Sequence, residues 1–305
     1  MSSESSRPCS STRRSLRARF QRGAVALLRS WGSAASLAVS AVKSGDRFSD
    51  RLAISLLLAR ASLFPLGLLR RFGIAIPDPA RLIHAYTCRS EGLIVRCPGG
   101  GGAHFLLFDP RHDPGVRAAV DALASGTFID VGAHVGLFSL RAGQRLGDRG
   151  RVLAIEPHPV RRMFLQQNVA ANRLRNITCL PYAIGDRNGV VTLYDLDPYL
   201  GRHSRDVSLA PSLGPSFEVS VRSLDSLCEE LNTESVGLVK IDVEGFEPLV
   251  LAGMEGVIDR WHPTIVFEAL TDSTFQESSV VLERHGYSVR QVDATNFLAE
   301  SRLTN

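Results

Sequence analysis

The chain of 305 residues has the composition of a folded protein: 44% of its residues are hydrophobic and 22% are charged, which excludes disorder throughout. The excess basic charge behind its net +4 lies in arginines near the start, so the charge balance does not predict a nucleic-acid-binding protein. Its five scattered cysteines lack the spacing of zinc or redox sites, and we expect reduced thiols in a cytoplasmic protein.

Residues 1–80 are expected to form a basic, partly disordered and hydrophobic helical extension. Its most hydrophobic stretch, 52–69, is about long enough to cross a bilayer, but Arg60 and Pro65 interrupt it. An arginine at mid-span costs about 2.5 to 3.5 kcal/mol on insertion scales. We therefore expect a helix that packs on the domain or touches a membrane surface, with peripheral membrane contact left open for residues 24–71.

Residues 81–125 are predicted to form a small β-hairpin and a lead-in helix. Strands are expected at 92–97 and 104–108, joined by a turn in the glycine-rich run 98–102. Apolar residues at helical spacing predict a helix over 113–124.

Residues 126–300 alternate between expected strands and helices, which predicts a parallel sheet covered on both faces. The expected strands are 127–131, 152–155, 177–181, 239–243 and 264–267, and the expected helices are 137–146, 160–172 and 248–260. Additional strands are expected at 190–194 and 217–221, and at 287–292 and 297–299 as an antiparallel edge. The predicted fold is α/β, a doubly wound and mostly parallel sheet.

The loop after the first of these strands is a candidate ligand site. It reads Asp130-Val131-Gly132-Ala133-His134-Val135-Gly136, and its two glycines let the backbone turn tightly and approach a ligand before a helix begins. Open parallel sheets bind ligands at the carboxyl ends of their strands. The glycine spacing is not the G-x-G-x-x-G of a dinucleotide fold, which disfavours a nicotinamide-dependent oxidoreductase.

Acidic residues follow the next two strands. Glu156 comes directly after the second strand, where a carboxylate can accept hydrogen bonds from both hydroxyls of a ribose. Asp186 follows the third strand and could reach the exocyclic amine of adenine. The alternative for Glu156 is a solvated surface carboxylate, but its register with the glycine loop favours a nucleoside site.

A run of ionisable residues, Lys240-Ile241-Asp242-Val243-Glu244-Gly245, closes the fourth strand. Strand alternation predicts that Lys240, Asp242 and Glu244 share one face. Ionisable groups in an otherwise apolar strand are costly unless they pair or take part in chemistry. They are therefore candidate catalytic residues, with a structural ion pair as the alternative.

Together these motifs resemble the FkbM-type methyltransferases. The similar segments are Thr127–Ala133, Ala154–Pro157 and Lys240–Gly245, together with Ser223-Leu224-Asp225 and Asn296–Ala299. The resemblance implies a Rossmann-like class I methyltransferase fold, S-adenosylmethionine as methyl donor, and a hydroxyl acceptor in sugar, lipid or secondary-metabolite chemistry. The family commonly has Asn where this chain has His134, whose titration could make cofactor affinity pH-dependent.

We assign roles to these residues as follows. The cofactor-binding candidates are Asp130, Gly132, His134, Gly136, Glu156, Asp186 and Asp242. Asp242 or Glu244 is the expected general base, oriented by Lys240, and His203 is an alternative. No metal is required, because the two carboxylates lack a clear third ligand for Mg²⁺.

The acceptor is expected to be a small molecule, a glycan or a lipid, and not a nucleic acid. The polar insertion 194–216 is expected to govern its selection. Two other functions remain open: a non-catalytic binding or membrane-docking protein on a methyltransferase scaffold, and the oxidoreductase. The sequence does not predict the oligomeric state.

Overall fold

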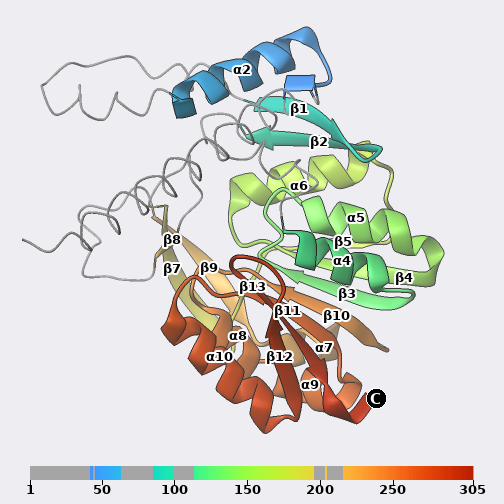
Figure 1. Ribbon diagram of the computed structural model, residues 1–305, viewed down its shortest axis with the longest axis vertical. Coiled ribbons are helices and arrows are strands. Elements are labelled where there is room, and N and C mark those ends of the chain that lie inside the picture. Colours follow the sequence, from blue (N-terminus) through green and yellow to red (C-terminus); the bar gives the residue numbers. More distant parts are fainter. Residues whose placement is uncertain are drawn as a thin grey trace, which may run out of the picture.

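The computed structural model describes residues 42–43, 45–62, 85–98, 113–195, 203–204 and 216–304 (Figure 1). Helix α2 (Phe48–Ser62) and a small hairpin lie at one end of the molecule, next to helices α5 and α6 of the main domain. Within the described ranges no helix is both long enough and apolar enough to span a bilayer. The proposed division of the chain at residues 80 and 125 stays a prediction.

A seven-stranded sheet forms the centre of the main domain. Its strands, in spatial order, are β12 (Tyr287–Gln291), β13 (Asn296–Ser301), β11 (Thr264–Glu268), β10 (Val236–Ile241), β3 (Gly126–Val131), β4 (Gly150–Ile155) and β5 (Ile177–Leu180). Neighbouring strands are parallel except where β13 pairs with β11 and β12. The strand order reverses between β3 and β10, so a ligand is expected beyond the carboxyl ends of this pair.

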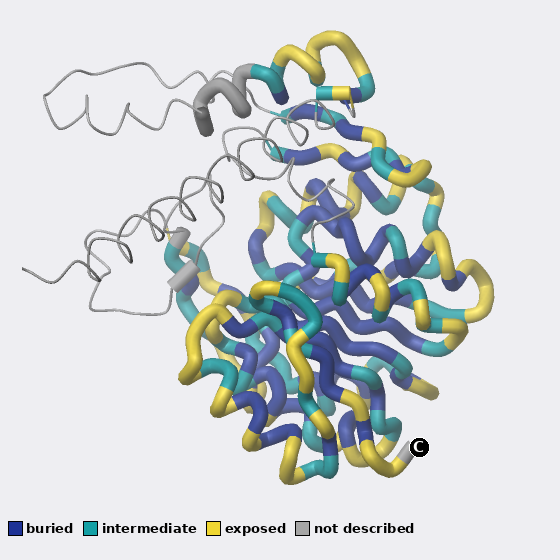
Figure 2. Tube along the Cα trace, in the orientation of Figure 1, coloured by how far each residue is buried: buried dark blue, intermediate teal, exposed yellow. Residues whose placement is uncertain are grey.

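Helices cover both faces of the sheet, as predicted. One face carries α4 (Pro114–Ala122), α5 (Leu137–Leu146) and α6 (Pro159–Ala171); the other carries α7 (Leu224–Glu230), α8 (Glu247–Ala252), α9 (Glu255–Trp261) and α10 (Asp272–Arg284). Strand alternation supplies both cores, because Phe128 packs with the first set and the adjacent Ile129 with the second. Figure 2 shows the buried band that results along the strands. The predicted doubly wound α/β fold is confirmed.

The predicted helix 248–260 is wrong as a single helix, because α8 and α9 are separate. A Cβ atom at Gly253 would overlap the carbonyl oxygen of Gly185, so the chain approaches its neighbour more closely here than a side chain would allow. Asp225 then accepts hydrogen bonds from the first N–H groups of α9, those of Gly256 at 3.0 Å and Val257 at 2.8 Å. The segment Ser223-Leu224-Asp225 is therefore structural: Ser223 caps α7 and Asp225 supports α9.

Two helices, α7 and α10, were not predicted. Each begins at a side-chain cap: the hydroxyl of Ser223 accepts the N–H of Ser226, and that of Thr271 accepts the N–H of Thr274. Ser223 and Thr271 are residue types that favour helix N-caps, so the start of each helix could have been predicted from the sequence.

The small hairpin of the structure uses a strand that was not predicted, and the predicted pairing of 92–97 with 104–108 stays a prediction. Strand β2 (Leu93–Pro98) matches the first expected strand, but it pairs with β1 (Ala85–Ser90), which precedes it. The turn is formed by Glu91 and Gly92, both with positive φ, as a type I′ hairpin turn requires. The expected partner strand 104–108 lies outside the described residues.

A second, four-stranded sheet stands beside the main one (Figure 1). Its strands, in spatial order, are β6 (Ala183–Ile184), β9 (Ser216–Arg222), β7 (Gly189–Asp195) and β8 (His203–Ser204). The expected strands 190–194 and 217–221 are confirmed as β7 and β9, and they belong to this sheet. Their apolar face forms one wall of the cavity described below.

Gly253→Ala should destabilise the protein, because the added methyl group has no room beside Gly185. Gly253 has φ −88°, which alanine adopts freely, so backbone strain plays no part. We expect the free energy of unfolding to fall by about 1 to 3 kcal/mol, measured by urea denaturation.

Gly189→Ala is the matched control, since an added Cβ there has no neighbour within 4 Å. Equal stability of the two variants would contradict the close approach between Gly253 and Gly185.

Candidate functional site

A cavity with an open volume of about 830 Å³ lies beyond the carboxyl ends of β3, β4 and β10. Five of the predicted site residues line it: Gly132, Glu156, Asp186, Asp242 and Glu244. Apolar residues of the second sheet and of the α8 region form the opposite wall: Val191, Leu193, Val221, Phe246 and Leu249. The strand tips chosen from the sequence therefore meet around one space.

Gly132 brings two walls of the cavity together. It has φ +81°, and a Cβ atom there would overlap the carbonyl oxygen of Asp242. Its N–H donates to the carbonyl of Ile155 at 3.0 Å, and the N–H of Asp242 donates to Val131 at 3.0 Å. The absence of a side chain at Gly132 therefore sets the position of Asp242 relative to the glycine loop.

Glu156 is fixed at the second strand tip with its side chain 3% exposed. One oxygen accepts the N–H of His158 at 2.9 Å and the other accepts the N–H of His134 at 2.8 Å. Burial raises the pKa of Glu156, and Arg161 and the two N–H groups oppose that rise. Each carboxylate oxygen keeps a lone pair that could accept a further hydrogen bond from a hydroxyl group in the cavity.

His134 supports the site through its main chain. Its φ is +56°, the left-handed region in which Asn and His are both enriched relative to most residues. The hydrogen bond from this residue to Glu156 is donated by the backbone N–H, which any non-proline residue supplies. The change from Asn to His is therefore compatible with the loop, although the effect of imidazole titration stays a prediction.

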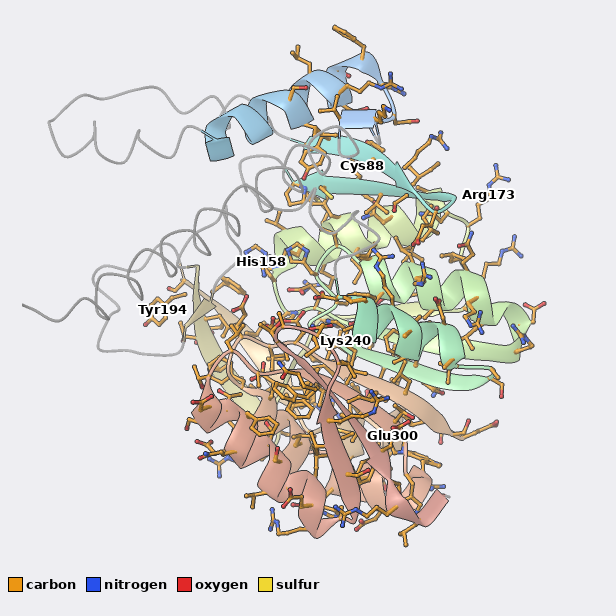
Figure 3. All side chains as sticks on the ribbon, in the orientation of Figure 1. Cys88, His158, Arg173, Tyr194, Lys240 and Glu300 are labelled. Carbon is orange, nitrogen blue, oxygen red and sulfur yellow. The ribbon has the colours of Figure 1, made fainter. Side chains whose placement is uncertain are left out.

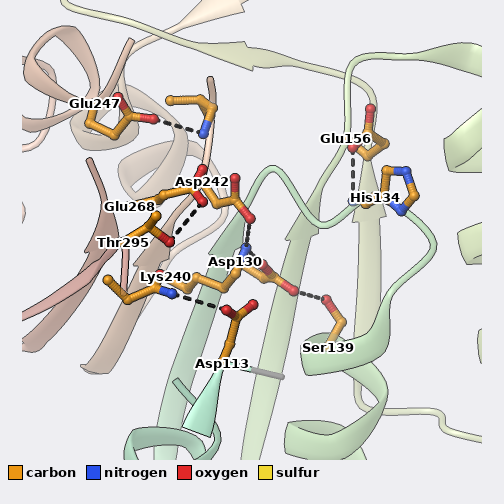
Figure 4. A network of polar contacts seen from close by, with 12 residues as sticks. Asp113, Asp130, His134, Ser139, Glu156, Lys240, Asp242, Glu247, Glu268 and Thr295 are labelled. Atoms are coloured by element: carbon orange, nitrogen blue, oxygen red, sulfur yellow. Dashed lines mark hydrogen bonds and ion pairs between the residues drawn. The ribbon is translucent and has the colours of Figure 1, made fainter. Parts of the chain in front are cut away.

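Lys240 lies at the centre of a buried polar network (Figures 3 and 4). Its Nζ is 3.1 Å from Asp242 and 3.5 Å from Asp130, and 5.5 Å from the centre of the Phe138 ring. Burial alone would lower the pKa of Lys240, but Asp242 and Asp130 raise it above its usual value. Lys240 is therefore held as a cation that links β3 to β10.

Asp130 and Gly136 support the cavity and do not line it. Asp130 is 1% exposed and accepts the hydroxyl of Ser139 at 2.6 Å, so its carboxylate lies beneath the cavity. Gly136, at φ +94°, begins α5, and a side chain there would collide with Leu165. Both residues support the glycine loop, and their expected direct contacts with a cofactor stay a prediction.

The predicted shared face of Lys240, Asp242 and Glu244 is wrong in part, because β10 ends at Ile241. Glu244 lies in the following loop with φ +56°, yet it lines the cavity beside Asp242. The loop is held by Glu247, which sequence reasoning missed. Glu247 is 1% exposed, and one of its oxygens accepts the N–H groups of Val243 and Gly245, each at 3.1 Å.

A further carboxyl group, Glu268, also escaped the sequence analysis. It ends β11, and its side chain lies beside that of Asp242 (Figure 4) and accepts the hydroxyl of Thr295 at 3.2 Å. Burial, then the charges of Asp242 and Glu244, raise the pKa of Glu268 to about 8. Its place at a strand tip was visible in the sequence, but its contact with Asp242 was not.

Asp186 and His203 stand apart from this network. Asp186 lines the cavity with its side chain 41% exposed and has Arg187 as a neighbour at 3.9 Å. The side chain of His203 lies outside the described part, so its role as an alternative base stays a prediction. No group of three or more His, Cys, Asp or Glu side chains in the described part is arranged to hold a metal ion.

His158 should make stability depend on pH. It caps α6, and its Nδ1 accepts the N–H of Val160 at 3.1 Å. Burial, with Arg161 and Arg162, lowers the pKa of His158 from 6.5 to about 4. The unfolded chain therefore binds a proton that the folded chain excludes, and this contribution to stability is lost as pH falls from 6.5 to 4.

Unfolding by urea across this pH range tests the effect against His158→Asn, which keeps an acceptor at the cap without titrating there. We expect the stability of the wild type to fall more steeply than that of the variant. Parallel stability curves would contradict the assignment.

Comparison with known proteins identifies the family. The family model of the methyltransferase FkbM domain matches residues 130–289, more than half of the chain. The 31-O-demethyl-FK506 methyltransferase FkbM of Streptomyces tacrolimicus is 30% identical over 233 residues, which cover 65% of this chain and 87% of the relative. Methyltransferase 1 of Beauveria bassiana is 29% identical over 182 residues, covering 53% of this chain and 72% of the relative.

Among solved structures, the methyltransferase FkbM of Methylobacillus flagellatus is 16% identical with a TM-score of 0.44, covering 87% of this chain and 58% of the other. The family assignment rests on the sequence matches, which include the glycine loop, Glu156 and the segment that follows β10. The chain belongs to the FkbM methyltransferase family and is an S-adenosylmethionine-dependent methyltransferase.

Proposed function

We propose that this enzyme transfers the methyl group of S-adenosylmethionine to a hydroxyl group of a small-molecule acceptor, with Asp242 as general base. The observation that carries the proposal is the cavity itself, which has Glu156 and Asp242 on either side of Gly132. A ribose at Glu156 would place the 5′-sulfur, two bonds from the ring, towards Asp242.

The residues of the cavity fit such a cofactor. The fixed oxygens of Glu156 can accept both ribose hydroxyls, and Asp186 can accept the adenine amine. Gly132 has no side chain, so the methionine portion of the cofactor could pass close to the backbone there. Asp242 offers negative charge to the sulfonium. Apolar side chains form the rest of the wall, so ring faces can be buried there.

Bound S-adenosylmethionine supplies an electrophilic methyl group, and the chain must position the acceptor and remove its proton. Asp242 takes the hydroxyl proton on its carboxylate as the oxygen–methyl bond forms and the sulfur–methyl bond breaks. Lys240 holds Asp242 in place through the 3.1 Å contact. Glu244, from the same loop, is the second candidate for the base. Much of the acceleration would come from alignment of oxygen, methyl and sulfur.

The acceptor is proposed to be a sugar, a lipid or a secondary metabolite. The name of the relative from Streptomyces tacrolimicus gives 31-O-demethyl-FK506 as its substrate, which supports a hydroxyl group on a small molecule. The apolar wall from the second sheet supports an acceptor with non-polar surface beside the hydroxyl.

Peripheral contact with a membrane is a separate part of this proposal. Phe48 is 83% exposed and Leu52 50% exposed on α2, and the side chains of Arg47 and Arg51 are exposed beside them. Apolar side chains flanked by arginines suit an anionic lipid surface.

Glu156→Gln should weaken cofactor binding. The amide loses the charge and one acceptor, so we expect the dissociation constant of S-adenosylhomocysteine to rise about ten- to hundredfold in calorimetry. Glu229→Gln, an exposed position on α7 outside the cavity, should bind like the wild type. Equal affinity in both variants, each well folded by circular dichroism, would rule out Glu156 as the ribose ligand.

Asp242→Asn should impair methyl transfer more than binding. We expect the rate to fall at least a hundredfold in extract of the native host supplied with methyl-labelled cofactor, with products identified by mass spectrometry. Affinity for S-adenosylhomocysteine should change only a few-fold, because the thioether carries no charge. Label in protein or nucleic acid would contradict the small-molecule acceptor, and full activity of the variant would exclude Asp242 as the base.

A further inference from the structure

Asp242 and Glu268 occupy equivalent places on neighbouring parallel strands. Ile241 pairs with Phe267 in the register of β10 and β11, so the next residue on each strand is a carboxyl group at the same edge of the sheet. Figure 4 shows the side chains of Asp242 and Glu268 converging at this edge, and the charge of Asp242 is the largest cause after burial of the raised pKa of Glu268. Two carboxyl groups at such neighbouring positions can form a direct hydrogen bond only when one of them carries a proton.

We propose that Glu268 is a positioning residue for methyl transfer: it shares a proton with Asp242 and thereby sets how much negative charge faces the sulfonium of the donor. The inference rests on the proposed function, which places the sulfonium beside Asp242. Glu268 does not line the cavity. Glu268 therefore influences methyl transfer only by changing the charge of Asp242.

The surroundings of Glu268 explain why the proton stays there. Asp242 and Glu244 face it from the end of β10, and Thr295 donates a hydroxyl hydrogen bond from the turn before β13. Further polar residues contact this network, both beside Asp242 and beside Glu268. Lys240 contacts the far side of Asp242, and Asn296, paired with Glu268 across β11 and β13, donates to Asp113 and Asp293.

The balance of these charges favours the protonated form of Glu268 at neutral pH. Burial and the two nearby carboxylates raise the pKa of Glu268 to about 8, and the hydrogen bond from Thr295 opposes that rise. Lys240 is already paired with Asp242 and Asp130, so its charge is largely neutralised by those two contacts. At pH 7 the pair formed by Asp242 and Glu268 thus carries about one negative charge.

A sulfonium beside Asp242 would shift this balance, whereas a thioether would not. The positive charge of S-adenosylmethionine favours loss of the proton from Glu268 to solvent, which adds a second negative charge next to the donor. S-adenosylhomocysteine has no charge on sulfur and leaves the proton in place. Donor binding is therefore coupled to proton release, and the pair discriminates the donor from the product.

Calorimetry of both ligands at pH 7.5, in buffers with different ionisation enthalpies, measures the protons released on binding. We expect the wild type to release more protons with S-adenosylmethionine than with S-adenosylhomocysteine. Glu268→Gln keeps a hydrogen-bond donor but cannot ionise, so it should lose this excess and still bind the donor within about threefold of wild type. The amino groups of the ligands titrate alike with every variant, so differences between proteins report on Glu268.

Glu268→Ala removes the hydrogen bond as well, and we expect donor affinity about tenfold weaker with product affinity nearly unchanged. From pH 7 to pH 9 the ratio of donor to product affinity should rise several-fold more in the wild type than in Glu268→Gln. Glu300→Gln, an exposed carboxylate farther along β13, is the control and should match the wild type.

The proposal is overturned if Glu268→Gln releases as many protons as the wild type, or if Glu268→Ala weakens both ligands equally. The near-isosteric Gln variant keeps the test decisive even if the Ala variant does not fold. If the wild type binds neither ligand, the proposed function fails and this inference falls with it. If both ligands bind and only the difference is absent, the role of Glu268 alone is wrong.

Discussion

The site depends on one buried charge arrangement, in which Lys240 joins Asp130 on β3 to Asp242 beyond β10. These strands meet where the strand order reverses, so the contact that ties them together also shapes the cavity. Lys240 and Asp130 are both buried, and removing one partner from such a pair costs about 3 to 5 kcal/mol, because the other charge is left uncompensated. Stability and the orientation of Asp242 are therefore set by the same lysine.

Much of the fold could be predicted from the sequence because the strands are apolar runs and α5 has a clear helical period. Errors in the predicted elements arose where contacts between distant parts of the chain, or a turn without a clear sequence signal, determine the structure. The break between α8 and α9 comes from the approach of Gly253 to Gly185, which lies far away in the sequence. The hairpin turn at Glu91 and Gly92 was not predicted, because it lacks the usual Asn-Gly or Asp-Gly signal.

The candidate site divides in the same way. Glu156, Asp186 and Asp242 could be found because each follows a strand, and parallel strands end at one edge of a sheet. The roles of Glu247 and Glu268 could not, because they depend on backbone N–H groups of a loop and on the ionisation of a neighbour. An acidic residue at the end of a strand indicates where a binding or catalytic site lies. Its protonation is set by contacts that sequence position does not reveal.

The central claim is that the strand-tip residues converge on one nucleoside sulfonium. A crystal structure of the protein with S-adenosylhomocysteine tests it most directly. We predict ribose hydroxyls within hydrogen-bond distance of Glu156, adenine near Asp186 and the sulfur atom facing Asp242. A ligand bound elsewhere, or a ribose that makes no contact with Glu156, would contradict it.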